Sequence, residues 1–131
     1  MKYTQMLKTH SRVEFYDITY QIKDIVKKSG VKEGIALVYV PHTTAGVTIN
    51  ENGDPDVRSD LKDALGDIVP DIGFRHYEGN SDSHTKTLLT GSSETLIIEN
   101  GDVVLGTWQS VYFSEYDGPR NRTFFVKIIE G

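Results

Sequence analysis

A short apolar run in the first third of the chain restricts the architecture more than any other segment does. Ile35–Val40 contains only hydrophobic residues, several of them β-branched or aromatic, and Pro41 follows directly. This composition is typical of a buried strand at the centre of a sheet. Proline lacks the N–H that a sheet ladder needs, so we expect the strand to end there.

Further strands and helices follow from the spacing of apolar residues. Alternating polar and apolar residues predict strands, and apolar residues at helical spacing predict helices. The predicted strands are Met1–His10, Val13–Asp17, Val47–Asn50, Leu96–Glu99, Val103–Leu105 with Thr107–Tyr116 as its continuation, and Thr123–Ile129. The predicted helices are Ile18–Ser29, Pro55–Ile68 and a short one over Ser83–Thr90, with Asp17, Asp54 and Asp82 as their N-caps.

These elements predict a single α+β domain with mixed or antiparallel sheets, because local and crossover connections occur together. Asn100-Gly101 joins two predicted strands by a type I′ turn, which needs positive φ at both positions. We expect about six or seven strands, two main helices and one short helix. The 131 residues predict one domain over 1–131, and the absence of cysteine excludes disulfides and thiolate-bound metals.

The charge of the chain limits its partners. There are 14 Lys and Arg against 19 Asp and Glu, which gives a net charge of −5. Proteins that bind nucleic acid carry a basic patch, so we expect no nucleic-acid partner. The apolar runs are far shorter than the roughly 20 residues that span a bilayer, so we expect no membrane segment. No apolar signal segment follows Met1, which predicts a soluble, cytoplasmic protein.

Three of the four histidines lie in polar, glycine-containing segments. His42, His76 and His84 have carboxylates nearby, with Glu51 beyond the first and Asp82 between the other two. Imidazole and carboxylate groups bind Zn²⁺ and related metals, and they also form a general base with its orienting carboxylate. Three unrelated loop histidines explain the spacing equally well, because it matches no compact zinc motif.

Residues 79–84 resemble the start of a helix that binds an anion. Small side chains and successive backbone N–H groups around Asn80 suit a phosphate at a helix N-terminus. A plain N-cap at Asp82 is the competing interpretation. A carboxylate at that position repels an anion, but it can hold a metal that itself meets phosphate.

Four further side chains are candidates for binding a ligand. Thr43 and Thr44 offer hydroxyls directly after the predicted central strand, although threonine-rich turns are also structural devices. Arg120 and Arg122 follow a tight turn and can each bind phosphate or carboxylate through two hydrogen bonds. On a solvated strand, simple surface charge explains the two arginines equally well.

Four ordered motifs together resemble the YjbQ-like family. The motifs are His42–Glu51, Gly79–His84, Gly106–Gln109 and Glu115–Arg120, and the resemblance runs over essentially the whole chain. It implies a compact α+β fold, a homotrimer, and a polar site for a metal or an anion near the subunit contacts. It also implies thiamine-phosphate synthase activity, in which hydroxymethylpyrimidine diphosphate and thiazole phosphate are joined and pyrophosphate is released.

The resemblance implies roles for the candidate residues around a small phosphorylated molecule. The catalytic candidates are His42, His84, Glu51 and Asp82, and the phosphate-binding candidates are Thr43, Thr44, Asn80, Arg120 and Arg122. His42, His76 and His84 would hold a divalent metal, Zn²⁺ or Mg²⁺, although Mg²⁺ prefers oxygen ligands. Two alternatives use the same residues: a metal-assisted phosphoester hydrolase, and a non-catalytic trimeric ligand-binding or scaffold protein.

Overall fold

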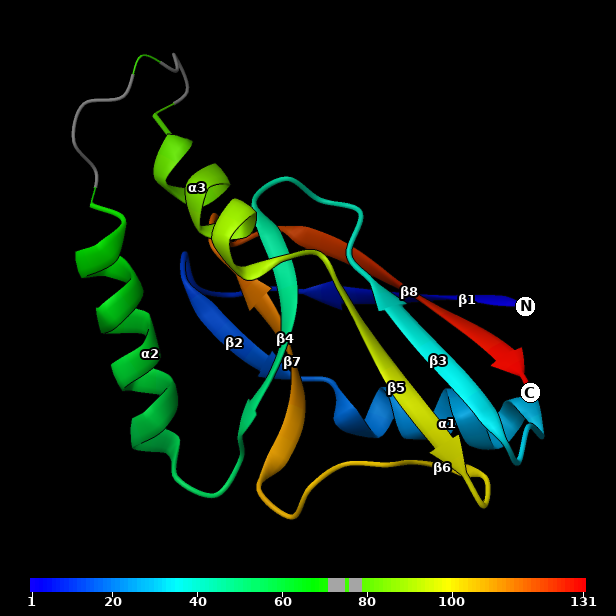
Figure 1. Ribbon diagram of the computed structural model, residues 1–131. Coiled ribbons are helices and arrows are strands. Elements are labelled where there is room, and N and C mark those ends of the chain that lie inside the picture. The colour runs from blue at the N-terminus through cyan, green and yellow to red at the C-terminus, as the bar shows by residue number, and fades with distance from the viewer. Residues whose placement is uncertain (71–74, 76–78) are drawn as a thin grey trace.

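Two antiparallel sheets and three helices make up the part of the chain that the computed structural model describes, residues 1–70, 75 and 79–131 (Figure 1). The strands are β1 (Lys2–Lys8), β2 (Glu14–Asp17), β3 (Gly34–Tyr39), β4 (Ala45–Glu51), β5 (Ser93–Glu99), β6 (Asp102–Val103), β7 (Gln109–Glu115) and β8 (Asn121–Glu130). The helices are α1 (Thr19–Ser29), α2 (Pro55–Ile68) and α3 (Ser81–Thr90). The predicted single α+β domain is confirmed. No helix in these residues is long and apolar enough to cross a membrane.

The larger sheet has the strand order β1-β8-β3-β5-β6, which confirms the predicted central position of β3. Its two faces differ, because side chains alternate along a strand. Ala36 and Val38 are buried, whereas Ile35 and Tyr39 on the other face are 38% and 45% exposed. The expected burial of this strand therefore holds on one face only: that face of the sheet packs on the core, and the other is open.

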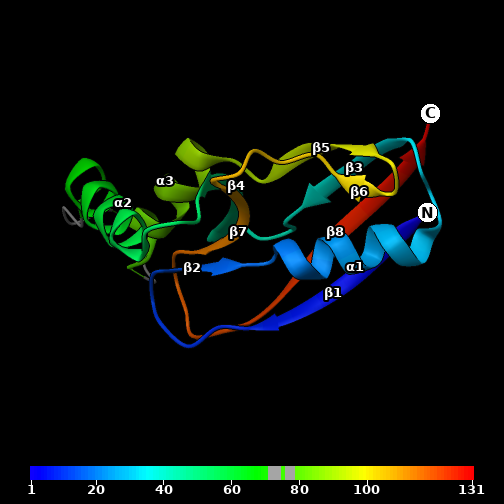
Figure 2. The ribbon, with the colours of Figure 1, turned by 90° about the horizontal axis from the view of Figure 1, so that it is seen from below.

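Helix α1 lies across the inner face of the larger sheet and forms the core with it (Figures 1 and 2). Ile22 and Val26 on α1 are fully buried, as the helical spacing predicts. The carboxylate of Asp17 accepts from the backbone N–H of Thr19 at 3.0 Å near the start of α1. Gly30 closes the helix in the left-handed conformation, with φ of 75°.

The smaller sheet has the order β2-β7-β4, and its central strand β7 follows the β5–β6 hairpin of the larger sheet. Asn100 and Gly101 have φ of 53° and 78°, as the predicted type I′ turn requires. Strand β6 is only 2 residues long, and β7 does not continue it, because β7 pairs with β2 and β4 in the other sheet. The predicted continuation of the hairpin arm is wrong, since the chain changes sheets between β6 and β7.

The helices α2 and α3 lie at the end of the molecule where the smaller sheet is found (Figure 1). Asp54 caps α2 by accepting from the backbone N–H of Asp56 at 2.9 Å, as expected. Helix α3 begins earlier than predicted, with Asn80 at the N-cap position, so Asp82 lies in the first turn and is not the cap. This start places α3 beside the turn that joins β7 to β8, because the side chain of Asn80 contacts Asp117.

Candidate functional site

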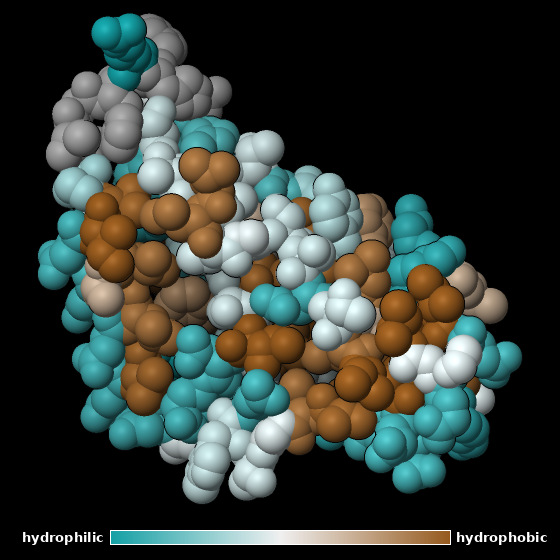
Figure 3. All heavy atoms as spheres, viewed as in Figure 1, coloured by the Kyte–Doolittle hydropathy of each residue, from teal (hydrophilic) through white to brown (hydrophobic). Residues whose placement is uncertain are grey.

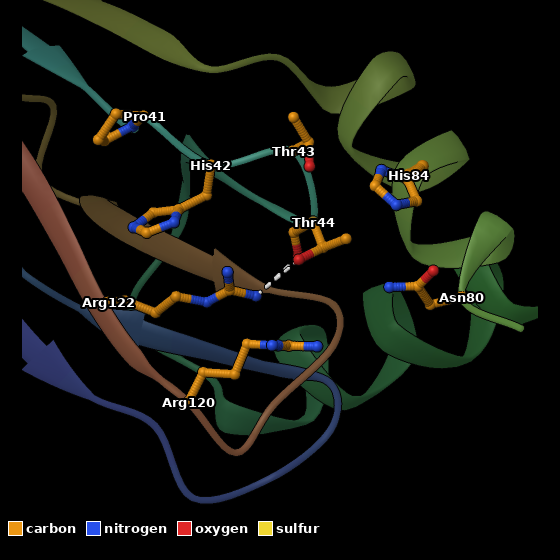
Figure 4. A pocket seen from close by; sticks show the side chains of 8 residues that line it. All are labelled: Pro41, His42, Thr43, Thr44, Asn80, His84, Arg120 and Arg122. Carbon is orange, nitrogen blue, oxygen red and sulfur yellow. Dashed lines mark hydrogen bonds between the residues drawn. The ribbon is translucent and has the colours of Figure 1, made fainter. Parts of the chain in front are cut away.

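Three segments that are far apart in the sequence form one polar pocket (Figure 4). The first is the loop between β3 and β4, the second is the start of α3, and the third is the start of β8 with the turn before it. The cavity has a volume of about 450 Å³ and is lined by Pro41, His42, Thr43, Thr44, Asn80, His84, Arg120 and Arg122. Seven of these eight residues were predicted as site residues, so the structure brings most of the candidates together.

Arg122 forms a buried ion pair with Glu115 at the base of the pocket. Nε of Arg122 donates to Oε1 of Glu115 at 2.7 Å, and Nη2 donates to Oε2. The two side chains are 5% and 0% exposed. Nη2 also donates to Oγ1 of Thr44 at 2.8 Å (Figure 4). Nη1 makes no hydrogen bond to any residue that the structure describes. Arg122 is therefore held rigidly and presents one nitrogen to the pocket.

Glu115 is ionised in this setting. Burial by itself raises the pKa of its carboxyl group, because the charged form loses its water. Hydrogen bonds from Arg122, from the backbone N–H of Asp117 and from the hydroxyl of Thr9 outweigh burial, and the pKa is lowered overall. The carboxylate of Glu115 thus neutralises the charge of Arg122 and fixes its orientation.

A second carboxylate, Asp117, orients two other residues of the pocket. Oδ2 of Asp117 accepts from Nη2 of Arg120 at 2.9 Å and from Nδ2 of Asn80 at 2.8 Å. Burial raises the pKa of Asp117, but these two hydrogen bonds and the charges of Arg120 and Arg12 outweigh it, so the pKa is lowered. Arg120 stays about half exposed, with 48% of its side chain accessible, and can move to meet a ligand.

The turn before β8 fits closely against the segment that follows β1. A Cβ atom on Gly118 would lie 2.2 Å from the carbonyl oxygen of Ser11, so only glycine fits there. Thr9 stabilises the same turn through two hydrogen bonds. Its hydroxyl donates to Glu115 at 2.7 Å and accepts from the backbone N–H of Arg120 at 2.8 Å. The close fit fixes the backbone of the turn from which Arg120 and Arg122 extend.

His42 is held in one tautomer. Its Nε2 accepts from the backbone N–H of Thr123 at 3.0 Å, so in the neutral ring the proton is on Nδ1. Burial lowers the pKa of His42, and the nearby cation of Arg122 lowers it further. The neutral ring is therefore the form present at neutral pH. It lies beside the guanidinium of Arg122 and offers Nδ1–H as a donor (Figure 4).

The walls of the pocket carry cations and hydrogen-bond donors. Two arginines, two histidines, an amide and two hydroxyls line it, and no described carboxylate does. Glu115 and Asp117 lie behind the arginines. The cavity therefore presents hydrogen-bond donors, and the carboxylates that pair with the two arginines lie outside its lining.

Two predicted site residues lie away from this pocket. Glu51 is at the far end of β4, about 20 Å of strand from Thr44, and accepts from the backbone N–H of Gly53 at 2.7 Å. Asp82 is buried and accepts from Nη2 of Arg12 at 3.1 and 3.2 Å. Neither carboxylate lines the cavity. The length of β4 separates Glu51 from the pocket, and the ion pair with Arg12 keeps Asp82 out of it.

The predicted three-histidine metal site is not assembled within the part of the chain that the structure describes. His42 and His84 both line the pocket, but no group of three or more histidine, aspartate or glutamate side chains there is arranged to hold a metal ion. The third predicted ligand, His76, lies outside the described residues. Nε2 of His42 is occupied by the N–H of Thr123. The metal therefore stays a prediction.

Comparison with family models shows which protein family the chain belongs to. The model described as "UPF0047 protein YjbQ-like" matches residues 3–131, nearly the whole chain. The chain belongs to the YjbQ-like family. UPF0047 protein MJ1081 of Methanocaldococcus jannaschii is 52% identical over 130 residues, which cover 98% of this chain and 94% of that protein. UPF0047 protein YugU of Bacillus subtilis is 45% identical, with 96% and 97% of the two chains covered.

Solved structures of YjbQ-like proteins have the same fold. An uncharacterised YjbQ/UPF0047 protein of Clostridium acetobutylicum matches with a TM-score of 0.93 and 53% identity, covering 98% of this chain and 99% of that one. A YbjQ-like protein of unknown function from Sulfolobus solfataricus matches with a TM-score of 0.96 and 30% identity, covering 100% and 97%. The resemblance read from the motifs is confirmed at the level of the family.

Sequence reasoning missed the carboxylates that position this YjbQ-like site. Glu115 and Asp117 belong to the quoted Glu115–Arg120 motif, yet neither was predicted as a site residue. The signal was present, because two acids directly precede a Gly-Pro turn and two arginines directly follow it, all within eight residues. A turn of that kind brings acids and bases on its two arms together.

Proposed function

We propose that the pocket binds the phosphate group of a small phosphorylated molecule. The observation that carries this proposal is the lining, which presents arginine, histidine and hydroxyl donors and, among the described residues, no carboxylate. Phosphate is the common metabolite group whose charge and acceptor oxygens suit such a lining. A cavity of about 450 Å³ is within the usual size range for a small-molecule ligand.

Three groups provide the contacts to phosphate oxygens. Arg120 reaches in from the rim with the donors that Asp117 leaves unused. Nη1 of Arg122 and Nδ1–H of His42 come from the base of the pocket, where neither has a described partner. Neither nitrogen is among the buried described atoms that lack a partner, and an anion placed between them can accept from both. The pocket is thus organised before the ligand arrives.

The reaction that we propose for this site is the one implied by the family resemblance. The C–O bond of hydroxymethylpyrimidine diphosphate breaks, pyrophosphate leaves with the electron pair, and the thiazole nitrogen supplies the pair for the new C–N bond. Arg120 and Arg122 would stabilise the charge that develops on the leaving group. His42, neutral and fixed, would donate to a leaving oxygen without carrying a charge of its own.

Anion binding is tested directly with sulfate and phosphate by calorimetry. Substituting Arg120→Met removes a charged donor and is expected to weaken binding about 10- to 100-fold. Lys27→Met makes the same charge change on an exposed helix face outside the pocket, and is expected to leave the affinity nearly unchanged. Equal losses in both variants would show that net charge alone attracts the anion, and would refute a specific site.

A turnover assay separates the proposed reaction from the alternatives. Formation of thiamine phosphate that needs both substrates supports the transferase. Release of phosphate from either substrate alone supports a phosphoester hydrolase instead. Tight binding without turnover of any substrate supports a ligand-binding or scaffold protein. His42→Ala is the matched inactive variant, because it removes one pocket donor and leaves the Glu115–Arg122 pair in place.

We propose in addition that the chain assembles as a homotrimer, as the family resemblance implies. The open face of the larger sheet supports an assembly, because apolar side chains gather there (Figure 3). Ile35 is paired with Ile97 on one side and Ile129 on the other, and these two are 59% and 47% exposed. A contiguous apolar patch of this kind is typical of a protein–protein contact.

A further inference from the structure

Helix α2 buries none of its 14 residues, although its sequence is amphipathic. Its apolar residues recur at helical spacing, and all are at least partly exposed: Val57, Leu61, Ala64, Leu65 and Ile68. Leu61 and Leu65 line a cavity of about 130 Å³ together with residues of the smaller sheet, so the helix packs loosely on its own chain. A helix in a protein is stabilised mostly by packing of its apolar face. The chain itself covers this face only in part.

An acidic stripe borders the apolar face of α2. Its four aspartates are exposed and follow one another at helical spacing: Asp56, Asp60, Asp63 and Asp67. None of them forms an ion pair with a residue that the structure describes. The basic flank of the helix lies on the other side, where Nη1 of Arg58 donates to the hydroxyl of Tyr112 at 2.9 Å. The outward-facing part of α2, here called the helix surface, comprises Asp60, Ala64, Asp67 and Ile68.

The open face of the larger sheet carries the opposite charge. Lys127 on β8 is directly opposite Leu37 on one side and Lys2 on the other, so the three side chains share this face. Both lysines are exposed, and neither forms an ion pair with a described residue. The acids Glu99 and Asp102 are confined to the edge that β5 and β6 form. This face, here called the sheet surface, comprises Lys2, Ile35, Leu37, Ile97, Lys127 and Ile129.

We propose that the helix surface of one copy of the chain packs on the sheet surface of the next copy. The inference rests on the proposed homotrimer and supplies the second surface that a trimer needs, because a closed ring of three identical chains joins two different surfaces at each contact. Neither surface suits a copy of itself, since aspartates would meet aspartates and lysines would meet lysines. Figure 3 shows apolar side chains over α2 and over the larger sheet on the same face of the molecule, so both surfaces can lie near one axis.

Lysine substitutions test the two surfaces separately. Ile68→Lys is expected to lower the mass measured by light scattering to one third of the wild-type mass, as is Ile35→Lys, because each places an ammonium group in the apolar part of the contact. Tyr20→Lys is the matched control. Tyr20 is 79% exposed on α1, which covers the opposite face of the larger sheet, so this variant is expected to stay trimeric.

Circular dichroism verifies that each variant is folded. If Ile68→Lys fails to fold, the double variant Asp60→Lys with Asp67→Lys serves in its place, because both positions are exposed. It sets lysines against lysines across the contact and is expected to dissociate the trimer in the same way.

Cysteine cross-linking shows which surfaces meet, and the chain has no cysteine of its own. Ala64→Cys places a thiol on the helix surface, and Leu37→Cys places one on the sheet surface. The two variants are co-expressed and treated with a short bismaleimide, and mass spectrometry distinguishes the products because the variants differ in mass. Covalent dimers are expected to contain mainly one chain of each kind.

The outcomes separate the inference from the homotrimer on which it rests. A trimer that survives Ile68→Lys, or cross-links that join mainly thiols at the same position, overturns the inference and leaves the homotrimer standing. Dissociation by Tyr20→Lys as well overturns it too, because any added lysine would then have the same effect. A wild-type chain that is not trimeric at the same concentration refutes the homotrimer itself.

Discussion

Replacing Glu115 with alanine is the sharpest test of how the site is held together. The substitution removes the one described carboxylate that pairs with Arg122, whose side chain is 5% exposed. Thr9 and the backbone N–H of Asp117 lose their acceptor at the same time. Thr44 remains as a partner of Arg122, but its neutral oxygens do not compensate a buried charge.

The loss of stability expected for Glu115→Ala follows from the burial of the ion pair. Removing one partner of a buried ion pair costs about 3–5 kcal/mol, because the other charge stays in the interior without compensation. A chain of 131 residues has an entropy of unfolding of about 0.28 kcal/mol/K near its midpoint. We therefore expect Glu115→Ala to lower the Tm by about 11–18 °C.

Urea and thermal unfolding at about pH 7, at one fixed protein concentration, measure this loss. Lys23→Met is the control, because it breaks the Lys23–Asp102 pair, whose side chains are 43% and 58% exposed, and is expected to cost less than about 1 kcal/mol. The folded-state pKa of Glu115 is lowered from its ordinary value of 4.5, so its contribution is complete above that pH and is lost as the pH falls through the folded-state pKa. The difference between wild type and variant should therefore shrink in acid.

A loss below about 1 kcal/mol would refute this account, since it would mean that water or another group solvates Arg122. The double variant Glu115→Leu with Arg122→Met distinguishes charge from packing. It removes both charges and keeps the volume, so we expect it to recover most of the stability that Glu115→Ala loses. A double variant as unstable as Glu115→Ala would assign the loss to hydrogen bonds and packing.

Three further predictions concern the site and the assembly. In a His84→Asn variant, in which His42 is the one histidine of the pocket among the described residues, the affinity for sulfate should be nearly constant between about pH 7 and 8, because the lowered pKa of His42 keeps its ring neutral there; a decline that follows an imidazole titration would contradict this. If the predicted divalent metal is part of the site, elemental analysis should find it in wild type and not in His42→Ala or His84→Ala, and equal content in all three would exclude it. Ile35→Lys places a charge in the exposed apolar patch and should reduce the mass measured by light scattering from trimer to monomer, with no loss of helix or sheet signal in circular dichroism.

Local signals in the sequence were sufficient for most elements of the fold. The apolar run at Ile35–Val40 predicted the central strand, and Asn100-Gly101 predicted the hairpin. Gly30 and Asp54 marked helix ends that the structure confirms. These features depend on backbone sterics and on hydrogen bonds within a few residues, so they can be read without knowing what packs against them.

The ion pairs of the site depended on contacts between distant segments. The sequence predicts Asp82 as a helix cap or a metal ligand, but its carboxylate binds Arg12, 70 residues away in the chain. The shared motif predicts that Glu51 lies close to His42, yet the extended strand β4 separates the two residues. The number of residues between two side chains does not determine the distance between them when a strand or a turn lies in between.

The amino-acid sequence alone determined which chemical groups this protein possesses and in which segments they lie: imidazoles, guanidiniums and hydroxyls where the hydrophobic pattern is interrupted. Only the tertiary structure decided which of them face the cavity. Glu115 and Asp117 lie behind the arginines, and Oδ1 of Asn80 has no donor among the described residues, because the packing of β8, α3 and the β3–β4 loop sets those distances. Electrostatic and hydrogen-bond energies depend on separation and burial, and both arise when the sheets pack.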